Sequence, residues 1–300
     1  MAIPSFDRLF PTMAIGSLPR PRWVVDIVRQ RLAGTLAPAA ADRLLDEAIV
    51  GAVRMQERAG LDYVSDGEWR RENYARIFAD RVGGFRRAPV CRGPLRLEAF
   101  VEKKLERQGA IVADEARFLM GVTSRRVLVA LPAPSTVGDL MWHPEHSAAA
   151  YPTKRAFVEA CAEIIREEVA ELVRLGVDAI QLDEPLLPRL ANPEVYHYDP
   201  RNREEVVQLS IETVNQVSEG MEPAFITVHL CHGHGEQGDV PEGTGLMQLA
   251  MDGMRVDRLA LEVNSPTGRS LQSLAGFPEN RLLGMGVIVP GEERVETAEL

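Results

Sequence analysis

Short apolar runs alternate with longer amphipathic segments along the whole chain. The short runs are rich in aliphatic and β-branched residues and have the length of strands. They cover residues 12–17, 61–65, 126–131, 178–182, 225–230, 257–262 and 281–288. The longer segments repeat apolar residues at helical spacing, and the clearest are 23–36, 41–59, 153–175 and 203–218. Shorter helices are expected at 72–81, 113–123, 245–253 and 270–274. This alternation predicts parallel βα units.

Unusual polar residues stand at the carboxyl ends of the predicted strands. Gly16 and Ser17 end the first run, an aspartate–glutamate pair ends the fourth, and a histidine and a cysteine end the fifth. A (β/α)8 barrel builds its active site from these ends. A Gly-x-Gly-x-x-Gly motif, which marks dinucleotide folds, is not present after the first run. We therefore predict an α/β fold, a TIM barrel whose eighth strand is absent from the chain.

The chain shows no shift in composition that would mark a domain boundary, so residues 1–300 are expected to form one barrel domain. The segment 83–125, after the second strand, is expected to be an insertion or a lid over the barrel mouth. It has no clear periodicity up to residue 109, and a helix is expected at 113–123. The pair Arg70-Arg71 is expected on a solvated face.

The net charge of the chain limits the kinds of molecule that it is expected to bind. A formal net charge of −10 argues against nucleic acid or an anionic membrane as the main partner. The cysteines are Cys91, Cys161 and Cys231, too few and too widely spaced for a disulfide framework, which favours a reduced, cytoplasmic setting. The N-terminal segment has no long apolar run that would indicate a signal peptide or a membrane helix.

His229 and Cys231 form the candidate metal site. Residues two apart in a strand point to the same face, so the imidazole and the thiol emerge side by side. Zinc prefers such nitrogen and sulfur ligands, and Glu262, at the end of the next predicted strand, is a candidate third ligand. The alternative is a buried histidine and cysteine that only pack in the core.

Acidic residues form the second candidate cluster. Asp66, Glu68, Asp183 and Glu184 would be costly to bury together without a cation, and an ammonium-bearing substrate would neutralise several of them. The alternatives are a helix N-cap for the pair at 183–184 and a turn for Asp66.

Several short motifs stand in an order that resembles the catalytic barrel of cobalamin-independent methionine synthases. They are Ile15-Gly-Ser17, Asp66-Gly-Glu68, Leu182-Asp-Glu-Pro185, Val228-His-Leu-Cys231 and Leu261-Glu262. The resemblance runs from about residue 12 to residue 297 and implies a zinc-dependent methyltransferase that makes methionine from homocysteine. It implies zinc ligands and a homocysteine site at the matching positions. The implied ligands are His229, Cys231 and Glu262, and the implied homocysteine contacts are Ser17, Glu68 and Asp183, with Gly16, Asp66 and Glu184 beside them.

The chain lacks two residues of the family pattern, one zinc ligand and one proton donor. The family has a fourth zinc ligand, a cysteine on its last strand, but this chain has no cysteine after Cys231. The family also has a proton-donating histidine after its seventh strand, where this chain has Gly286-Val-Ile-Val-Pro290. His234 is the candidate proton donor in its place, with His232 as the alternative.

The methyl donor is expected to be a methyl-folate or a different compound. Where the family contacts its folate, this chain has Arg189 and, out of register, Trp142. These observations leave three hypotheses open. The first is methyl transfer to homocysteine, the second is zinc-dependent alkyl transfer to another small thiol, and the third is a non-catalytic barrel that binds a ligand. A homo-oligomer is compatible with each of them.

Overall fold

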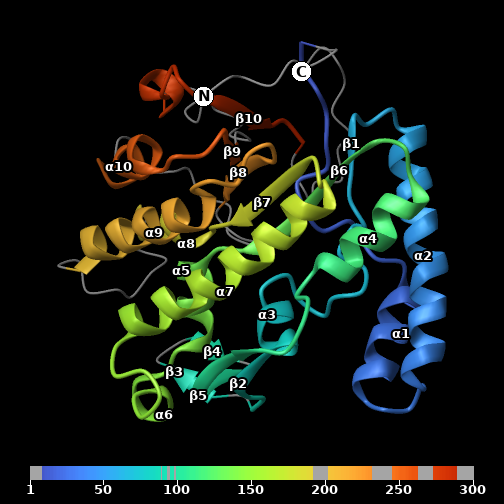
Figure 1. Ribbon diagram of the computed structural model, residues 1–300, viewed down its shortest axis with the longest axis horizontal. Coiled ribbons are helices and arrows are strands. Elements are labelled where there is room, and N and C mark those ends of the chain that lie inside the picture. The colour runs from blue at the N-terminus through green and yellow to red at the C-terminus, as the bar shows by residue number, and fades with distance from the viewer. Residues whose placement is uncertain are drawn as a thin grey trace.

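The computed structural model describes residues 9–88, 90–92, 95–97, 99–191, 202–231, 245–262 and 273–288. Its centre is a curled sheet of six parallel strands in the order β1-β6-β7-β8-β9-β10 (Figure 1). The strands are β1 (Tyr63–Val64), β6 (Arg126–Pro132), β7 (Ala179–Asp183), β8 (Phe225–Leu230), β9 (Arg258–Glu262) and β10 (Leu282–Gly286). This half-barrel confirms the predicted α/β fold of an incomplete TIM barrel.

Helices connect the strands and cover the outer face of the sheet. The predicted helices are present as α1 (Arg22–Leu32), α2 (Pro38–Arg58), α3 (Arg76–Arg81), α4 (Ala113–Val122), α7 (Lys154–Leu175), α9 (Arg203–Ser218) and α10 (Gly245–Gly253). Three further helices were not predicted. α5 (Pro134–Met141) and α6 (Pro144–Ser147) lie between β6 and α7, and α8 (Leu186–Ala191) follows β7. A short 3-10 helix, Ser273–Gly276, stands near the predicted helix 270–274.

The first predicted strand is wrong, because residues 12–17 form no strand. Only Thr12 pairs with the start of β1: its carbonyl oxygen accepts from the amides of Asp62 and Tyr63 at 3.0 and 3.1 Å. Further along, the carbonyl oxygen of Ile15 accepts from the Gln181 side chain at 2.5 Å instead of from a neighbouring strand. The segment thus lies beside the sheet, but a side chain replaces the ladder that would define a strand.

The segment 83–125 contains strands that the sequence did not predict. β2 (Val82–Arg86) pairs antiparallel with β5 (Phe100–Arg107), and β3 (Val90–Arg92) pairs antiparallel with β4 (Leu95–Leu97). These two small sheets lie apart from the central sheet, next to α3 and α6 (Figure 1). The helix α4 then leads the chain back to the start of β6.

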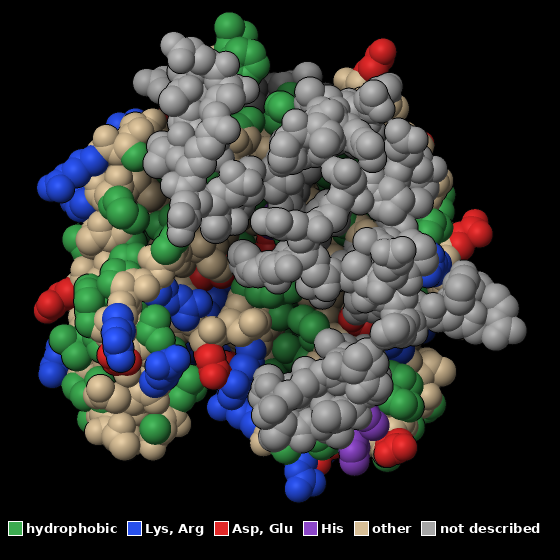
Figure 2. Space-filling view, turned by 180° about the vertical axis from the view of Figure 1, so that it is seen from behind, with side chains coloured by type: hydrophobic (Ala, Val, Ile, Leu, Met, Phe, Trp, Pro, Cys, Tyr) green, Lys and Arg blue, Asp and Glu red, His purple; other side chains and the backbone are tan. Residues whose placement is uncertain are grey.

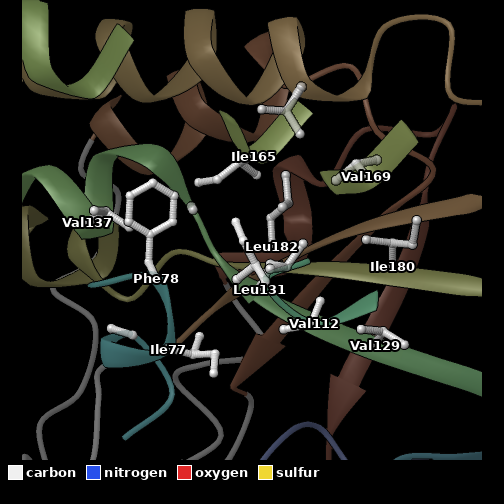
Figure 3. Packing of buried hydrophobic residues seen from close by; sticks show 14 of the residues in the cluster. Ile77, Phe78, Val112, Val129, Leu131, Val137, Ile165, Val169, Ile180 and Leu182 are labelled. Carbon is white, nitrogen blue, oxygen red and sulfur yellow. The ribbon is translucent and has the colours of Figure 1, made fainter. Parts of the chain in front are cut away.

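The main core lies between the sheet and the helices. Leu131 of β6 and Leu182 of β7 point from neighbouring strands toward Ile165 of α7 (Figure 3). Each of these side chains is buried, and burying one contributes roughly 2 kcal/mol. The alternate residues of the same strands face inward, where Leu128 and Ala179 pack with Tyr63 and Phe225.

Candidate functional site

Asp183 and His229 lie side by side at the carboxyl ends of β7 and β8. The two residues are direct partners in the register of these strands. Nδ1 of His229 donates to Oδ1 of Asp183 at 3.0 Å, since the carboxylate can only accept. This hydrogen bond directs the other ring nitrogen, Nε2, away from Asp183. A carboxylate that orients an imidazole in this way is a common arrangement around protein-bound metal ions.

Cys231 directly follows β8, and its side chain contacts that of His229. Burial lowers the pKa of His229, but the carboxylate of Asp183 and the sulfur of Cys231 outweigh it and raise the pKa to about 10. The register pairs Leu230 of β8 with Leu261 of β9, so the next residues, Cys231 and Glu262, follow adjacent positions. The nitrogen of His229 and the sulfur of Cys231 are thus neighbouring donors, and the backbone of Glu262 ends the next strand; donors of these residue types fit zinc.

Glu68 lies opposite this group, on the turn after β1. Its backbone has a φ of +59°, which is strained by roughly 1–2 kcal/mol for a residue with a side chain. Asp66 holds the turn, because its Oδ1 accepts from the amide of Glu68 at 2.9 Å. The hydroxyl of Ser17 donates to Oε2 of Glu68, and a Cβ placed on Gly16 would lie 3.7 Å from Oε1 of Glu68. Ser17, Gly16, Asp66 and Glu68 thus come together.

The carboxylates of Glu68, Asp66 and Asp183 are close enough to affect the protonation of Glu68. Burial raises the pKa of Glu68; Arg71 opposes this shift, and the charges of Asp183 and Asp66 add to it. Oδ2 of Asp66 and Oε1 of Glu68 are buried and have no hydrogen-bond partner. An unpartnered buried carboxylate oxygen is costly. The cluster is therefore suited to receive a cationic, hydrogen-bond-donating group.

Glu184 faces the other way from Asp183. Alternate residues of a strand point to opposite faces, and the Glu184 carboxylate lies among the hydroxyls of Ser135, Thr136 and Ser210 on α5 and α9. Burial raises its pKa from 4.5 to about 7, against the hydrogen bonds from these hydroxyls. This placement gives no support to the prediction that Glu184 contacts substrate.

Comparison with known proteins identifies the family. Residues 10–300 match the family described as "Cobalamin-independent synthase, Catalytic domain". The chain belongs to this family. The resemblance inferred from the motifs is thereby confirmed.

Relatives and solved structures agree with the family assignment. A methionine synthase of Sulfolobus acidocaldarius is 25% identical over 295 residues, covering 97% of this chain and 78% of that protein. One of Pyrococcus horikoshii is 28% identical over 299 residues, covering 97% and 79%. A B12-independent methionine synthase of Shewanella sp., solved in complex with selenomethionine, superposes with a TM-score of 0.79 at 24% identity, over 97% of this chain and 84% of that one. At this identity the last comparison supports the fold.

Two residues of the candidate site were not predicted from the sequence. Gln181 faces inward from β7 and donates to Oδ1 of Asp183 at 2.8 Å, so it joins the Ile15 carbonyl to the Asp183–His229 pair. The only signal in the sequence was its place two residues before Asp183. Arg71, expected on a solvated face, is instead buried with Glu115. A run of two arginines carries no sign of such a partner.

A second group of metal-binding residue types lies elsewhere in the synthase fold. Ligand atoms of His143, Glu145 and His146 lie within 4.8 Å of one another. They belong to α6 and its N-cap, well apart from β8 (Figure 1). Figure 2 shows histidine side chains at one edge of the molecule beside acidic ones. Nδ1 of His143 accepts from the amide of Glu145 at 3.2 Å, so in the neutral ring the proton sits on Nε2, which does not favour metal binding there.

Some predicted residues lie outside the described residues. These are His232 and His234, together with the side chains of Glu262 and Arg189. Within the part of the chain that is described, no helix is long and apolar enough to cross a membrane.

Proposed function

We propose that this protein transfers a methyl group to the thiol of homocysteine, and that zinc held by His229, Cys231 and Glu262 activates the thiol. The observation that carries the proposal is the meeting of two groups at one end of the sheet. The Asp183–His229 pair, with Cys231 beside it, faces the buried acids around Glu68. Family membership supports the reaction, since relatives across this chain are named methionine synthases.

The acidic cluster would hold the ammonium group of the amino acid. Glu68 and Asp66 each have a buried oxygen without a hydrogen-bond partner, and Asp183 adds a third negative charge nearby. Arg71 lies 3.7 Å from Oε1 of Glu68 and compensates only part of this charge. An ammonium group supplies both the missing charge and the missing donors. Ser17 fixes the orientation of Glu68 for this contact.

The zinc ligands would be set by hydrogen bonds of this chain. Asp183 accepts from Nδ1 of His229, which leaves Nε2 as the ligating nitrogen. When bound, zinc would hold the sulfur of homocysteine as a thiolate at neutral pH. The residues of the cluster would then keep the amino acid in place while the sulfur attacks the methyl group. If the donor is a methyl-folate, its leaving nitrogen needs a proton, and we propose that His234 supplies it.

Cys231→Ser tests the metal site. We expect purified wild type to carry about one zinc per chain and the variant to lose it, because a serine hydroxyl is a much poorer zinc ligand than a thiolate. Metal content is measured by elemental analysis, and methionine formation is measured on the same samples. Cys161→Ser is the matched control, since Cys161 is buried in α7 and its sulfur lies outside the site. A Cys231→Ser variant with full zinc and full activity would refute the assignment.

Acceptor profiling separates homocysteine from other thiols. Small thiols without an amino group lack the ammonium that the acidic cluster is suited to bind. We expect turnover with homocysteine to exceed turnover with such thiols. Equal rates would favour the second hypothesis, alkyl transfer to another small thiol. Turnover with neither acceptor in zinc-loaded protein would favour a non-catalytic ligand-binding barrel.

A further inference from the structure

Arg71 is shared by two carboxylates at unequal distances. Its Nη2 lies 2.9 Å from Oε2 of Glu115, and its Nε donates to the same oxygen at 3.0 Å. Its Nη1 donates to the carbonyl oxygen of Ala130 on β6 at 3.0 Å and lies 3.7 Å from Oε1 of Glu68. Glu68 therefore has an ion-pair partner nearby but no hydrogen bond from it. The guanidinium is held on the Glu115 side.

Both partners of the closer pair are buried. The side chains of Arg71 and Glu115 are 2% and 5% exposed. Burial opposes the charge on Arg71, but Glu115 and Glu68 outweigh it and hold the pKa of the guanidinium above its ordinary value. A guanidinium does not lose its proton in a protein, so its buried charge needs a carboxylate partner. Glu115 lies nearer to it than Glu68 does, and the charge of Asp66 adds to these two.

Glu115 reaches Arg71 because α4 is fixed in place. It lies in the first turn of α4, within the segment whose role the sequence left open. Oε1 of Glu168, on α7, accepts from the amides of Ile111, Val112 and Ala113 at 2.9, 2.7 and 2.8 Å. A carboxylate at a helix N-terminus stabilises it. The segment is thus anchored to the barrel wall at the point that presents Glu115.

We infer that Glu115 is a positioning residue that keeps Arg71 from neutralising Glu68, and so keeps Glu68 available for a cationic group of the substrate. The inference rests on the proposed function, since it concerns how the ammonium of an amino-acid thiol is bound. If Glu115 lost its charge, Arg71 would retain two donors without an ionised partner. The nearest carboxylate to receive them is Glu68, whose Oε1 would then be occupied by Arg71 instead of by the ammonium.

Glu115→Gln tests the inference because the amide keeps the shape and removes the charge. The two ligands are homocysteine and 4-mercaptobutanoate, which has the same thiol and carboxylate but no ammonium. We expect the affinity of zinc-loaded protein for homocysteine to fall about tenfold, which corresponds to about 1.4 kcal/mol. The affinity for 4-mercaptobutanoate should not change. Calorimetric titration measures both.

The matched control is Asp114→Asn, which removes a charge from the neighbouring residue of α4, whose side chain is 66% exposed and pairs with Arg117. It should leave both affinities unchanged. Thermal unfolding of each variant checks the fold. If Glu115→Gln does not fold, Glu115→Asp is tested in its place. The shorter side chain holds its carboxylate one methylene further from Arg71. We then expect the affinity for homocysteine to fall about threefold and the affinity for 4-mercaptobutanoate to stay the same.

The outcomes separate the inference from the function on which it rests. An equal loss for both ligands would show a purely structural role for Glu115, and no loss for either would show no role; each result overturns the inference and leaves the proposed function intact. Wild-type protein that binds neither thiol would overturn the proposed function and the inference with it.

Discussion

At the scale of single residues, neighbours in the chain have opposite environments. Asp183 faces the inside of the sheet and accepts from Gln181 and His229, whereas Glu184 faces the helices and lies among hydroxyls. The difference follows from the alternation of side chains along β7. The motif that contains both residues does not tell which one faces the site. Strand register decides it.

Gln181 should influence metal binding without touching the metal. Its amide donates to the carboxylate that orients His229. We expect Gln181→Leu to weaken zinc binding by up to about 10-fold, the lower end of the range found when direct partners of metal ligands are removed, because Gln181 acts one step further out, through Asp183. Competition with a coloured chelator measures the affinity. Gln208→Leu, on the exposed side of α9, is the control. Unchanged zinc affinity in Gln181→Leu would contradict this role.

Glu184 should make the free energy of unfolding depend on pH. Burial raises its pKa from 4.5 to about 7 in the folded protein, so the folded state binds its proton more tightly than the unfolded state. Its stabilising contribution is therefore complete below about pH 4.5 and is lost as the pH rises to about 7. The change is on the order of 3 kcal/mol.

A comparison with Glu184→Gln isolates this effect, because glutamine does not titrate. Urea unfolding at several pH values should show the wild type losing stability relative to the variant between about pH 4.5 and 7. A constant difference between the two proteins over this range would show that Glu184 has an ordinary pKa.

At the scale of elements, periodicity predicted the long helices and most strands of the sheet. It failed where other contacts decide the structure. Residues 12–17 have the composition of a strand, but the Ile15 carbonyl is bound by a side chain. The paired strands β2 and β5 include Gly83 and Gly84 and charged residues of both signs, a composition typical of loops. No local pattern marks their pairing, which joins segments well separated in the chain.

Two glycines in helical regions should respond oppositely to alanine. Gly176 ends α7 with a φ of +83°, where its amide bonds to the carbonyls of Leu172 and Val173. Gly176→Ala should destabilise the protein by about 1 kcal/mol, because alanine is strained in this conformation. Gly51 lies inside α2 with no atom within 4 Å of an added Cβ, so Gly51→Ala should stabilise by roughly 0.5–1 kcal/mol. Thermal unfolding measures both, and a shift in the same direction would contradict the assignment of these positions.

At the scale of the whole molecule, the fold explains why distant motifs could be grouped from the sequence. The carboxyl ends of parallel strands meet at one edge, so Glu68, Asp183 and His229 were predicted to converge from residue type and strand order alone. The buried pair of Arg71 and Glu115 could not be predicted in the same way. It depends on how α4 is placed by Glu168 of α7, and such packing leaves no periodic signal.

The shared acceptor at Glu168 has a consequence for the motions of the molecule. Because one carboxylate oxygen holds the amides of residues 111–113, these hydrogen bonds break together when α4 separates from α7. In a hydrogen-exchange experiment the three amide protons are therefore expected to report the same free energy of opening, as one opening unit. We expect each such opening to carry Glu115 away from Arg71, so the population of the open state, measured from these amides, would report how much of the time the acidic cluster loses its arrangement.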